Sequence, residues 1–364
     1  MIALVADPVD TLHMTGGPTL VQVGLVGAGN ISETHARALR EIPGVAIAGV
    51  YAPTREHAER LAAQHGSRAY DTLDRLLDER PLDMVVIGSP SGCHAEHGIE
   101  AAKRGLHVLV EKPLDVTAAR GKALVDTAEK TGVTVGVIFQ DRLKPDVQRI
   151  KALVDTGRLG TPILADARVK WYRSPDYYGG SRWRGTRALD GGGALMNQGV
   201  HTIDLLLWLF GPVRRVFGRT ATRLHRIEVE DTAVAVLEFA NGAVGTIEAA
   251  TSAYPGYPRR LELTGSEGTL ILDGDNLAAV DLRPGSAGER ADVRPAAPSS
   301  STPASATSPV VADASAHRRV FEDFIRAVRT RGSPCCDGRD GLRSVEAIEA
   351  IYESARSNRA VDLS

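Results

Sequence analysis

The feature that most constrains the fold is an alternation of short apolar runs with helical stretches near the N-terminus. Strands that are separated by helices of about ten residues or more form βαβ units, and these units build a parallel sheet. Such a sheet binds its ligands at the carboxyl ends of its strands. The expected strands are Val21–Val26, Val45–Val50, Met84–Ile87, His107–Val110 and Val133–Phe139.

Beyond residue 143 the pattern changes, because strand-type runs from Val213 to Leu272 follow one another without intervening helices. The 364 residues suffice for two cores. The fold class is therefore an α/β Rossmann domain plus an α+β domain with an open, largely antiparallel sheet. The expected segments are an N-terminal extension (1–20), the Rossmann domain (21–142), the α+β domain (143–316), a flexible Pro/Ala/Ser-rich loop (284–314), and C-terminal helices (317–364) that pack back near the first domain.

Composition narrows the function classes. The net charge of −2 gives no basic surface for nucleic acid, and no apolar run is long enough to span a bilayer. The three cysteines do not form a disulfide framework, and the N-terminus does not resemble an export signal, so we expect a cytoplasmic protein. Cys93, His94 and His97 at a helix start do not close a metal site, and no metal is expected.

A glycine turn follows the first strand and opens a helix. Gly27 permits a tight turn, and Gly29 allows the backbone to approach a pyrophosphate, which the helix N-terminus at Asn30 and Ile31 attracts. This context predicts binding of NAD or NADP. The alternative is a plain tight turn.

The end of the second strand bears on the choice of cofactor. An acid that binds the adenosine ribose is expected there, but the chain has Ala52, Thr54 and Arg55 instead. Thr54 and Arg55 could hold a 2′-phosphate, which predicts that NADP(H) is accepted. In the alternative interpretation, Arg55 only begins a solvated helix.

Two further segments supply reactive groups. Lys112 follows a buried strand, where its charge is costly, although the strand could end in ordinary solvated charges. Asn197, His201 and Asp204 have the spacing of one helix face, although His201 could be a histidine of the core. A histidine base and a nearby ammonium suit oxidation of a secondary alcohol, in which Asn197 could orient the substrate or the imidazole.

Together these residues resemble the Gfo/Idh/MocA oxidoreductase family, from Val21 to Leu363. The resemblance implies a Rossmann domain, bound NAD or NADP, and association into a homodimer or homotetramer through the C-terminal sheet. It implies that Lys112 and His201 form the active site; many members have aspartate where this chain has Asn197. It also implies that Ser89, Pro90, His94 and the Glu111–Lys112 pair lie beside the cofactor.

Within the family, Asn197-Gln198 and Trp171-Tyr172-Arg173 look like the UDP-N-acetylglucosaminuronate 3-dehydrogenases and the glucoside 3-dehydrogenases. Aromatic faces suit sugar rings, and guanidinium groups suit carboxylate or phosphate. A loop at a subunit interface would have the same composition. Besides Lys112, Asn197 and His201, the expected substrate-binding residues are Gln140, Arg142, Trp171, Arg173, Tyr178 and Arg184.

The predicted function is therefore NAD(P)-dependent oxidation or reduction of a ring hydroxyl of a sugar, glycoside or nucleotide sugar, with C3 as the expected carbon. Alternatives are an NAD-dependent glycosidase that works by transient oxidation, an inositol dehydrogenase, and a ligand sensor without chemistry. The presence of both Lys112 and His201 argues against the sensor.

Overall fold

The structure is a computed structural model that describes residues 20–284 and 314–363. The expected N-terminal extension and nearly all of the Pro/Ala/Ser-rich segment lie outside the described residues. The division of the chain into domains at residue 142 stays a prediction.

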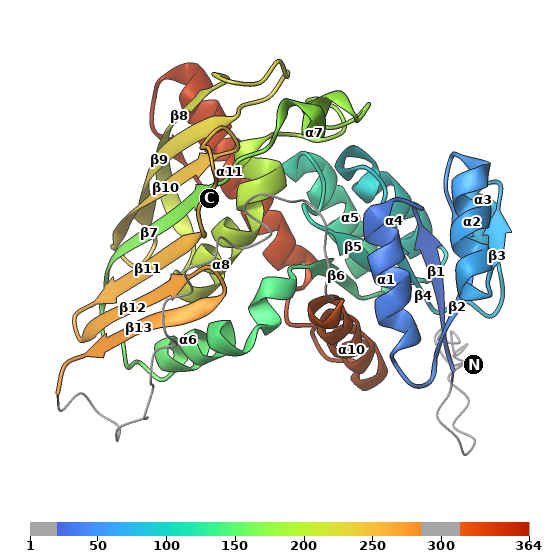
Figure 1. Cartoon of the computed structure of the whole chain (residues 1–364). Helices are drawn as coiled ribbons and strands as arrows, with labels where there is room; N and C mark the ends of the chain where they lie inside the picture. The colour runs from blue at the N-terminus through green and yellow to red at the C-terminus, as the bar shows by residue number, and fades with distance from the viewer. Residues whose placement is uncertain (1–19, 285–313, 364) are drawn as a thin grey trace, which may run out of the picture.

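The first sheet has six parallel strands in the order β3-β2-β1-β4-β5-β6 (Figure 1). The strand order reverses between β1 and β4, where an open α/β sheet places its ligand site. The sequence prediction missed β3, a short strand with little apolar character. The strands are β1 (Val21–Val26), β2 (Val45–Tyr51), β3 (Arg68–Tyr70), β4 (Met84–Ile87), β5 (His107–Glu111) and β6 (Val135–Ile138).

Helices α1 to α5 connect these strands and cover the sheet, as βαβ units require (Figure 1). Glycine C-caps in the left-handed conformation end two of them, at Gly66 and Gly132. The helices are α1 (Asn30–Arg40), α2 (Arg55–His65), α3 (Leu73–Leu77), α4 (His94–Lys103) and α5 (Ala118–Thr131).

The second sheet has eight strands in the order β13-β12-β11-β7-β10-β9-β8-β14. Only the β7–β10 pair is parallel, so the sheet is largely antiparallel and the expected fold class is confirmed. The strands are β7 (Pro162–Lys170), β8 (Val213–Ala221), β9 (Thr232–Phe239), β10 (Val244–Ala250), β11 (Arg260–Gly265), β12 (Gly268–Asp273), β13 (Asn276–Leu282) and β14 (Val361–Asp362).

Helices lie against one face of this sheet and leave the other face bare (Figure 1). The leucine-rich α8 (Val200–Phe210) contacts β7 and β11, and α6 (Pro145–Asp155) contacts β12 and β13. On the bare face, Val234, Val236 and Val244 are each about half exposed. Short helical elements occur in both parts of the chain: η1 (Ser91–Cys93) and η2 (Gln140–Leu143) follow β4 and β6, and α7 (Pro175–Gly179) and the π-helical η3 (Ala194–Gly199) follow β7.

The last two long helices pack against the first sheet, and one of them also reaches the second sheet. Helix α11 (Gly338–Ser357) lies between them and contacts α5 and β6 on one side and α8 and β8 on the other (Figure 1). A Cβ at Gly341 would lie 2.4 Å from Val137, so glycine is needed for this close packing. Helix α10 (Ser315–Thr330) packs on α1, β6 and η2.

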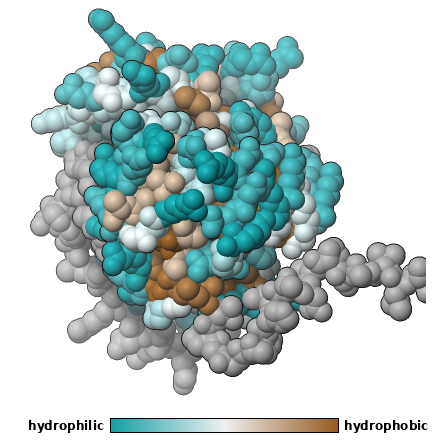
Figure 2. Space-filling model, turned by 90° about the vertical axis from the view of Figure 1, so that its right-hand side faces the viewer, coloured by the Kyte–Doolittle hydropathy of each residue, from teal (hydrophilic) through white to brown (hydrophobic). Residues whose placement is uncertain are grey.

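The face at the right of Figure 1, where α2 and α3 lie, is mostly hydrophilic, with hydrophobic side chains gathered near its lower edge (Figure 2). Within residues 20–284 and 314–363, no helix combines the length and the apolarity needed to cross a membrane.

Replacing Phe324 with alanine should destabilise the protein strongly. Phe324 is fully buried, and its ring lies 2.7 Å from the position that a Cβ of Gly136 would occupy on β6. The cavity left behind should lower the free energy of unfolding by about 3–5 kcal/mol, measured by denaturant titration. As a control, Tyr257→Ala at a position that is 54% exposed should change it by about 0.5 kcal/mol. Equal losses in the two variants would contradict this account.

Candidate active site

The glycine turn lies at the reversal of strand order between β1 and β4. Gly27 has φ +116°, and a Cβ there would lie 2.6 Å from the carbonyl oxygen of Gly88, so only glycine fits. A Cβ at Gly29 would meet nothing within 4 Å, so open space lies in front of the N-terminus of α1. Helix N–H groups and open space together suit a pyrophosphate. Ser89 lies next to this turn, with its backbone nitrogen 3.0 Å from the same Gly27 position.

The end of β2 leaves the choice between the cofactors open. Ala52 is buried, and Thr54 is the N-cap of α2. The Arg55 side chain is 72% exposed, and its Nε donates to Glu59 over 2.7 Å. Arg55 thus begins a solvated helix and remains within reach of solvent, so its contact with a 2′-phosphate stays a prediction.

Lys112 extends from the end of β5 toward the second part of the chain. Its Nζ donates to the backbone oxygen of Asn197 over 2.9 Å. Burial lowers the pKa of Lys112, and the negative charges of Glu111 and Asp190 oppose this shift. The contact brings together two segments that lie 85 residues apart in the sequence.

His201 lies on α8, just beyond the π-helical turn that accepts the Lys112 hydrogen bond. Burial, followed by the charge of Lys112, lowers the pKa of His201 to about 3. The imidazole is therefore neutral at physiological pH and can accept a proton. Its side chain is 13% exposed, and its Nδ1 has no hydrogen-bond partner among the described residues.

Asp141 is a charged neighbour of His201 that the sequence reasoning missed. Its Oδ2 lies 3.9 Å from the Nδ1 of His201, and its carboxylate pairs with Arg259 and with Lys144. Burial favours the neutral acid, but Arg259 and Lys144 hold the pKa well below its usual range, so the group is ionised. Its position directly after β6, between Gln140 and Arg142, was the available signal.

The helix expected to carry Asn197, His201 and Asp204 on one face is divided, because Asn197 lies in η3 and the other two lie on α8; their common face stays a prediction. Residues 194–199 form a π-helical turn, whose i→i+5 bonding changes the spacing of side chains around the axis. The Asn197 side chain donates to Asp190, and its Oδ1 accepts from Gln198 over 2.9 Å.

The assignment of Arg142 to the substrate is wrong. Its side chain is 2% exposed, and Nε and Nη2 donate to the two carboxylate oxygens of Asp204 over 2.8 and 2.6 Å. Nη1 donates to Asp340 over 2.9 Å and to the backbone oxygen of Cys335 over 3.0 Å. Every nitrogen is occupied, so Arg142 connects η2, α8 and α11 rather than binding a ligand.

Two residues expected at the cofactor are held elsewhere. Both ring nitrogens of His94 face backbone oxygens, those of Pro113 at 2.7 Å and Ser89 at 2.9 Å, so His94 joins the loops after β4 and β5. Glu111 is 6% exposed and contacts the Nε2 of His35 over 2.8 Å, behind the strand. Neither side chain is free for a cofactor.

The Glu111 cluster has the composition of a metal site. The ligand atoms of His35, Glu111 and His317 all lie within 4.8 Å of one another and are buried. Burial would raise the pKa of Glu111, but His35, His317 and Lys112 lower it to about 2. An ionised carboxylate that faces imidazoles is satisfied without an ion, and the expectation of no metal stays a prediction.

The aromatic loop is only partly arranged as expected. Trp171 and Tyr178 are each 7% exposed, and the Tyr178 hydroxyl donates to Thr251 over 3.0 Å, so Tyr178 packs into the interior. Tyr177 belongs to the same aromatic segment; its hydroxyl accepts from Gln198 over 3.0 Å, and the Arg184 guanidinium lies 4.4 Å from its ring centre.

Arg173 contacts this loop, whereas the place of Gln140 in the substrate site stays a prediction. Nη2 of Arg173 donates to Gln198 over 2.7 Å, and its guanidinium lies 5.1 Å from the ring centre of Trp171. The side-chain oxygen of Gln140 is buried and has no hydrogen-bond partner among the described residues. Gln198, which the sequence showed only as the neighbour of Asn197, therefore links the loop to the Lys112 contact.

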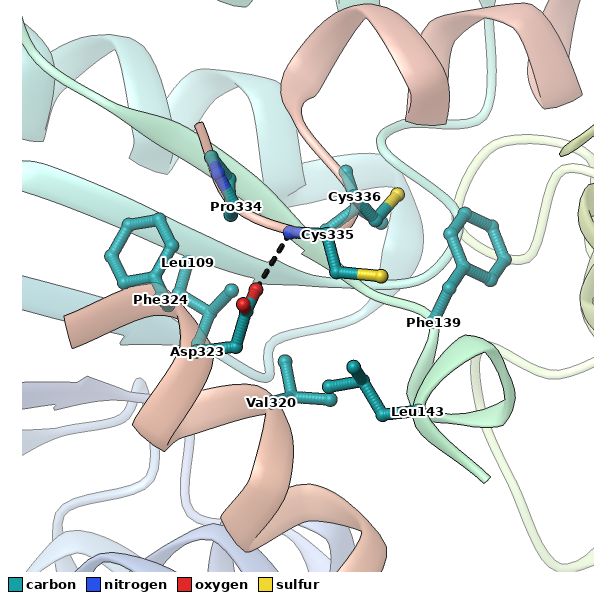
Figure 3. A pocket seen from close by; sticks show the side chains of 10 residues that line it. Leu109, Phe139, Leu143, Val320, Asp323, Phe324, Pro334, Cys335 and Cys336 are labelled. Atoms are coloured by element: carbon teal, nitrogen blue, oxygen red, sulfur yellow. Dashed lines mark hydrogen bonds between the residues drawn. The ribbon is translucent and has the colours of Figure 1, made fainter. Parts of the chain in front are cut away.

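A pocket behind the first sheet is separate from these groups. Leu109, Val320, Phe324 and other apolar side chains line it, and the backbone nitrogen of Cys335 donates to Asp323 over 2.6 Å (Figure 3). Burial raises the pKa of Cys335 to about 11, so its thiol stays protonated and unreactive. Its apolar lining does not suit a sugar or a phosphate.

Replacing Arg142 with methionine should test its structural role. The change leaves Asp204 and Asp340 buried without their cation, which should lower the free energy of unfolding by about 3–5 kcal/mol in a denaturant titration. Below the unfolding temperature, KM for the substrate should stay close to that of the unchanged protein. A large rise in KM without a loss of stability would show that Arg142 contacts the substrate.

Two family models match the sequence. Residues 21–139 match the oxidoreductase family with an NAD-binding Rossmann fold, and residues 147–271 match the GFO/IDH/MocA C-terminal domain.

The chain is similar to several characterised dehydrogenases. D-apiose dehydrogenase of Paraburkholderia graminis is 29% identical over 346 residues, covering 93% of this chain and 88% of that protein. D-xylose 1-dehydrogenase (NADP(+)) 2 of Haloferax volcanii is 30% identical over 297 residues, covering 81% and 85%. The crystal structure of the WlbA dehydrogenase from Bordetella pertussis in complex with NADH and UDP-GlcNAcA is 32% identical and superposes with a TM-score of 0.84, covering 94% and 99%.

These similarities extend over both sheets and agree with the glycine turn and with the strand order. They confirm the expected resemblance and the NAD(P) cofactor. The chain belongs to the Gfo/Idh/MocA family of oxidoreductases.

Proposed function

We propose that this oxidoreductase transfers a hydride between NAD(P) and a ring secondary alcohol of a sugar or nucleotide sugar, at C3. One observation carries the proposal: Nζ of Lys112 reaches the Asn197 carbonyl at the π-helical turn that precedes His201. The electrostatic effect of Lys112 on His201 supports an ammonium and a neutral imidazole that act on one substrate hydroxyl.

The cofactor supplies the hydride acceptor in the oxidising direction. The neutral His201 imidazole takes the hydroxyl proton, and the negative charge of Asp141 favours this step because it raises the pKa of His201. The Lys112 ammonium stabilises the negative charge that grows on the substrate oxygen as the proton leaves. Asp141 faces Nδ1 and offsets the positive charge that the imidazole gains.

The loop around α7 supports a sugar that carries a negative group. The guanidinium groups of Arg184 and Arg173 lie over the Tyr177 ring, 4.4 and 5.6 Å from its centre, so two positive charges gather beside one aromatic side chain. Guanidinium groups suit carboxylate and phosphate. WlbA, which is 32% identical to this chain, was crystallised with NADH and UDP-GlcNAcA. We therefore propose an acidic or phosphorylated sugar, for which UDP-GlcNAcA is the first compound to test.

We further propose that the chain self-associates through the bare face of the second sheet, in the cytoplasm. Val236 pairs with Phe217 on β8, and Val244 pairs with Leu164 on β7, which forms an apolar area across neighbouring strands. Exposed apolar areas of this kind are typical of protein interfaces. The three free cysteines agree with a reducing compartment.

Lys112→Met should lower kcat by about 100-fold to 1,000-fold while the cofactor still binds, because only the stabilisation of the developing charge is lost. The measurement is NADH absorbance with UDP-GlcNAcA and a panel of sugars, and NADH fluorescence reports cofactor binding. Lys122→Met, on the exposed side of α5, is the matched control and should be unchanged. Equal turnover in the two variants would disprove the role of Lys112. Release of aglycone without net formation of NADH would favour the alternative function, an NAD-dependent glycosidase.

Arg55→Ala should raise KM for NADP+ by about tenfold and leave KM for NAD+ nearly unchanged, because only the 2′-phosphate needs the guanidinium. Initial rates with each cofactor provide the test. If both KM values stay the same, Arg55 only begins α2.

Val236→Glu should convert the assembly to monomers, since it introduces a charge into the apolar area. Sedimentation velocity measures the change. Val236→Thr keeps the shape of the side chain and should leave the assembly intact. An assembly that survives the glutamate places the interface elsewhere.

A further inference from the structure

We infer that Asp190 is a positioning residue for the proposed dehydrogenation: through Asn197 it aligns Lys112, and its negative charge keeps Lys112 in the ammonium form. The inference rests on the proposed function. Asp190 belongs to none of the predicted site residues, and it was visible in the sequence only as the residue before three glycines.

A single residue, Asn197, links the Asp190 carboxylate to the Lys112 ammonium. Its side chain is fully buried; one oxygen accepts from the backbone nitrogen of Gly185 over 2.7 Å, and the other accepts from the Asn197 side chain. The backbone oxygen of Asn197 then accepts from Nζ of Lys112 over 2.9 Å. Asn197 thus joins the anion and the cation and holds them in a fixed relation.

The loop that carries Asp190 is packed tightly against the nucleotide-binding part of the chain. The backbone nitrogen of Gly92 on η1 donates to Leu189 over 2.9 Å, and a Cβ on Gly92 would lie 2.1 Å from the carbonyl oxygen of Ala188. Gly191 has φ +76°, and a Cβ there would lie 2.6 Å from Val116. Asp190 therefore sits on a loop that is packed against η1 and against Val116, four residues beyond Lys112.

The charge of Asp190 affects the protonation of Lys112. Burial raises the pKa of Asp190 to about 6, against the lowering effects of the Gly185 and Asn197 hydrogen bonds and of Lys112 and Arg184. The carboxylate is therefore ionised above about pH 6, where it opposes the burial that lowers the pKa of Lys112. Without this charge, Lys112 should lose its proton at a lower pH.

The other titratable groups near Asp190 do not replace it. Tyr177, Tyr178 and Tyr352 feel its charge, but burial raises the pKa of each, so they stay neutral over the working range. Arg184 adds a positive charge that further lowers the pKa of Lys112. Glu111 is the other anion that supports the ammonium, and it lies on the opposite side, with His35 and His317.

The first test measures the proton affinity of Lys112 directly, without substrate. Cyanate reacts with the neutral amine, so the carbamylation rate of Lys112 between pH 6.5 and 10, followed by peptide mass spectrometry, reports its titration. In Asp190→Asn the midpoint should fall by about one pH unit. Exposed Lys103 is the reference in every sample, and Asp126→Asn on the exposed side of α5 is the matched control. An unchanged Lys112 midpoint would overturn the inference.

The second test exchanges the two partners. Asp190→Asn alone should lower kcat/KM about tenfold at pH 8 and move the basic limb of the pH profile to lower pH. The double variant Asp190→Asn/Asn197→Asp returns a carboxylate to the other end of the same hydrogen bond. It should recover most of the activity and the Lys112 midpoint. If Asp190 only anchors Gly185, the exchange recovers neither.

Two measurements keep the outcomes distinct. Thermal unfolding checks that each variant is folded. If Asp190→Asn is not, Asn197→Ala takes its place, because it removes the hydrogen bond but keeps the negative charge of Asp190. The Lys112 midpoint should then shift by less than the amount that the double variant recovers. Carbamylation needs neither sugar nor cofactor. A protein that reduces no cofactor with any sugar would therefore disprove the proposed function while the Lys112 shift still tests Asp190.

Discussion

The hydrogen bond between Lys112 and the Asn197 carbonyl is the interaction on which the rest of the site depends. It brings the end of a parallel strand in contact with a π-helical turn of the second part of the chain. A lysine held half-buried costs free energy unless anions and oxygen acceptors surround it. Glu111, Asp190 and the Asn197 oxygen supply that environment, so the cation is kept where the proposed chemistry needs it.

Buried ion pairs around this contact fix the remaining geometry. Arg142 joins η2 to α8 and α11, and Arg259 holds Asp141 beside His201. Each pair adds little net stability, because the attraction between buried charges is largely offset by their desolvation. Its larger effect is to specify which segments pack against each other. Their effect is to hold η2, α8 and α11 in one arrangement, which is what the proposed acid–base reaction of His201 requires.

Some features of the fold and of the site have local signals in the sequence, and others do not. Local signals mark the parallel strands, the glycine turn, Lys112 and His201. These signals are apolar runs, glycines that allow a positive φ, and a charge at a strand end. Asp141 and Arg142 were distinguishable only in three dimensions, since adjacent residues in a 3₁₀ turn point in different directions. Asn197 was assigned with α-helical spacing, which its π-helical turn does not follow.

The sequence by itself determined the architecture, because hydrophobic periodicity and glycine conformation act over a few residues and are readable without the fold. Only the tertiary structure decided which polar side chains face a ligand and which neutralise one another. The partners of a buried charge come from distant segments, as Asp204 does for Arg142 and Asp190 does for the lysine site. No local pattern encodes such a pairing, since its energy arises from exclusion of water when the two parts of the chain close together.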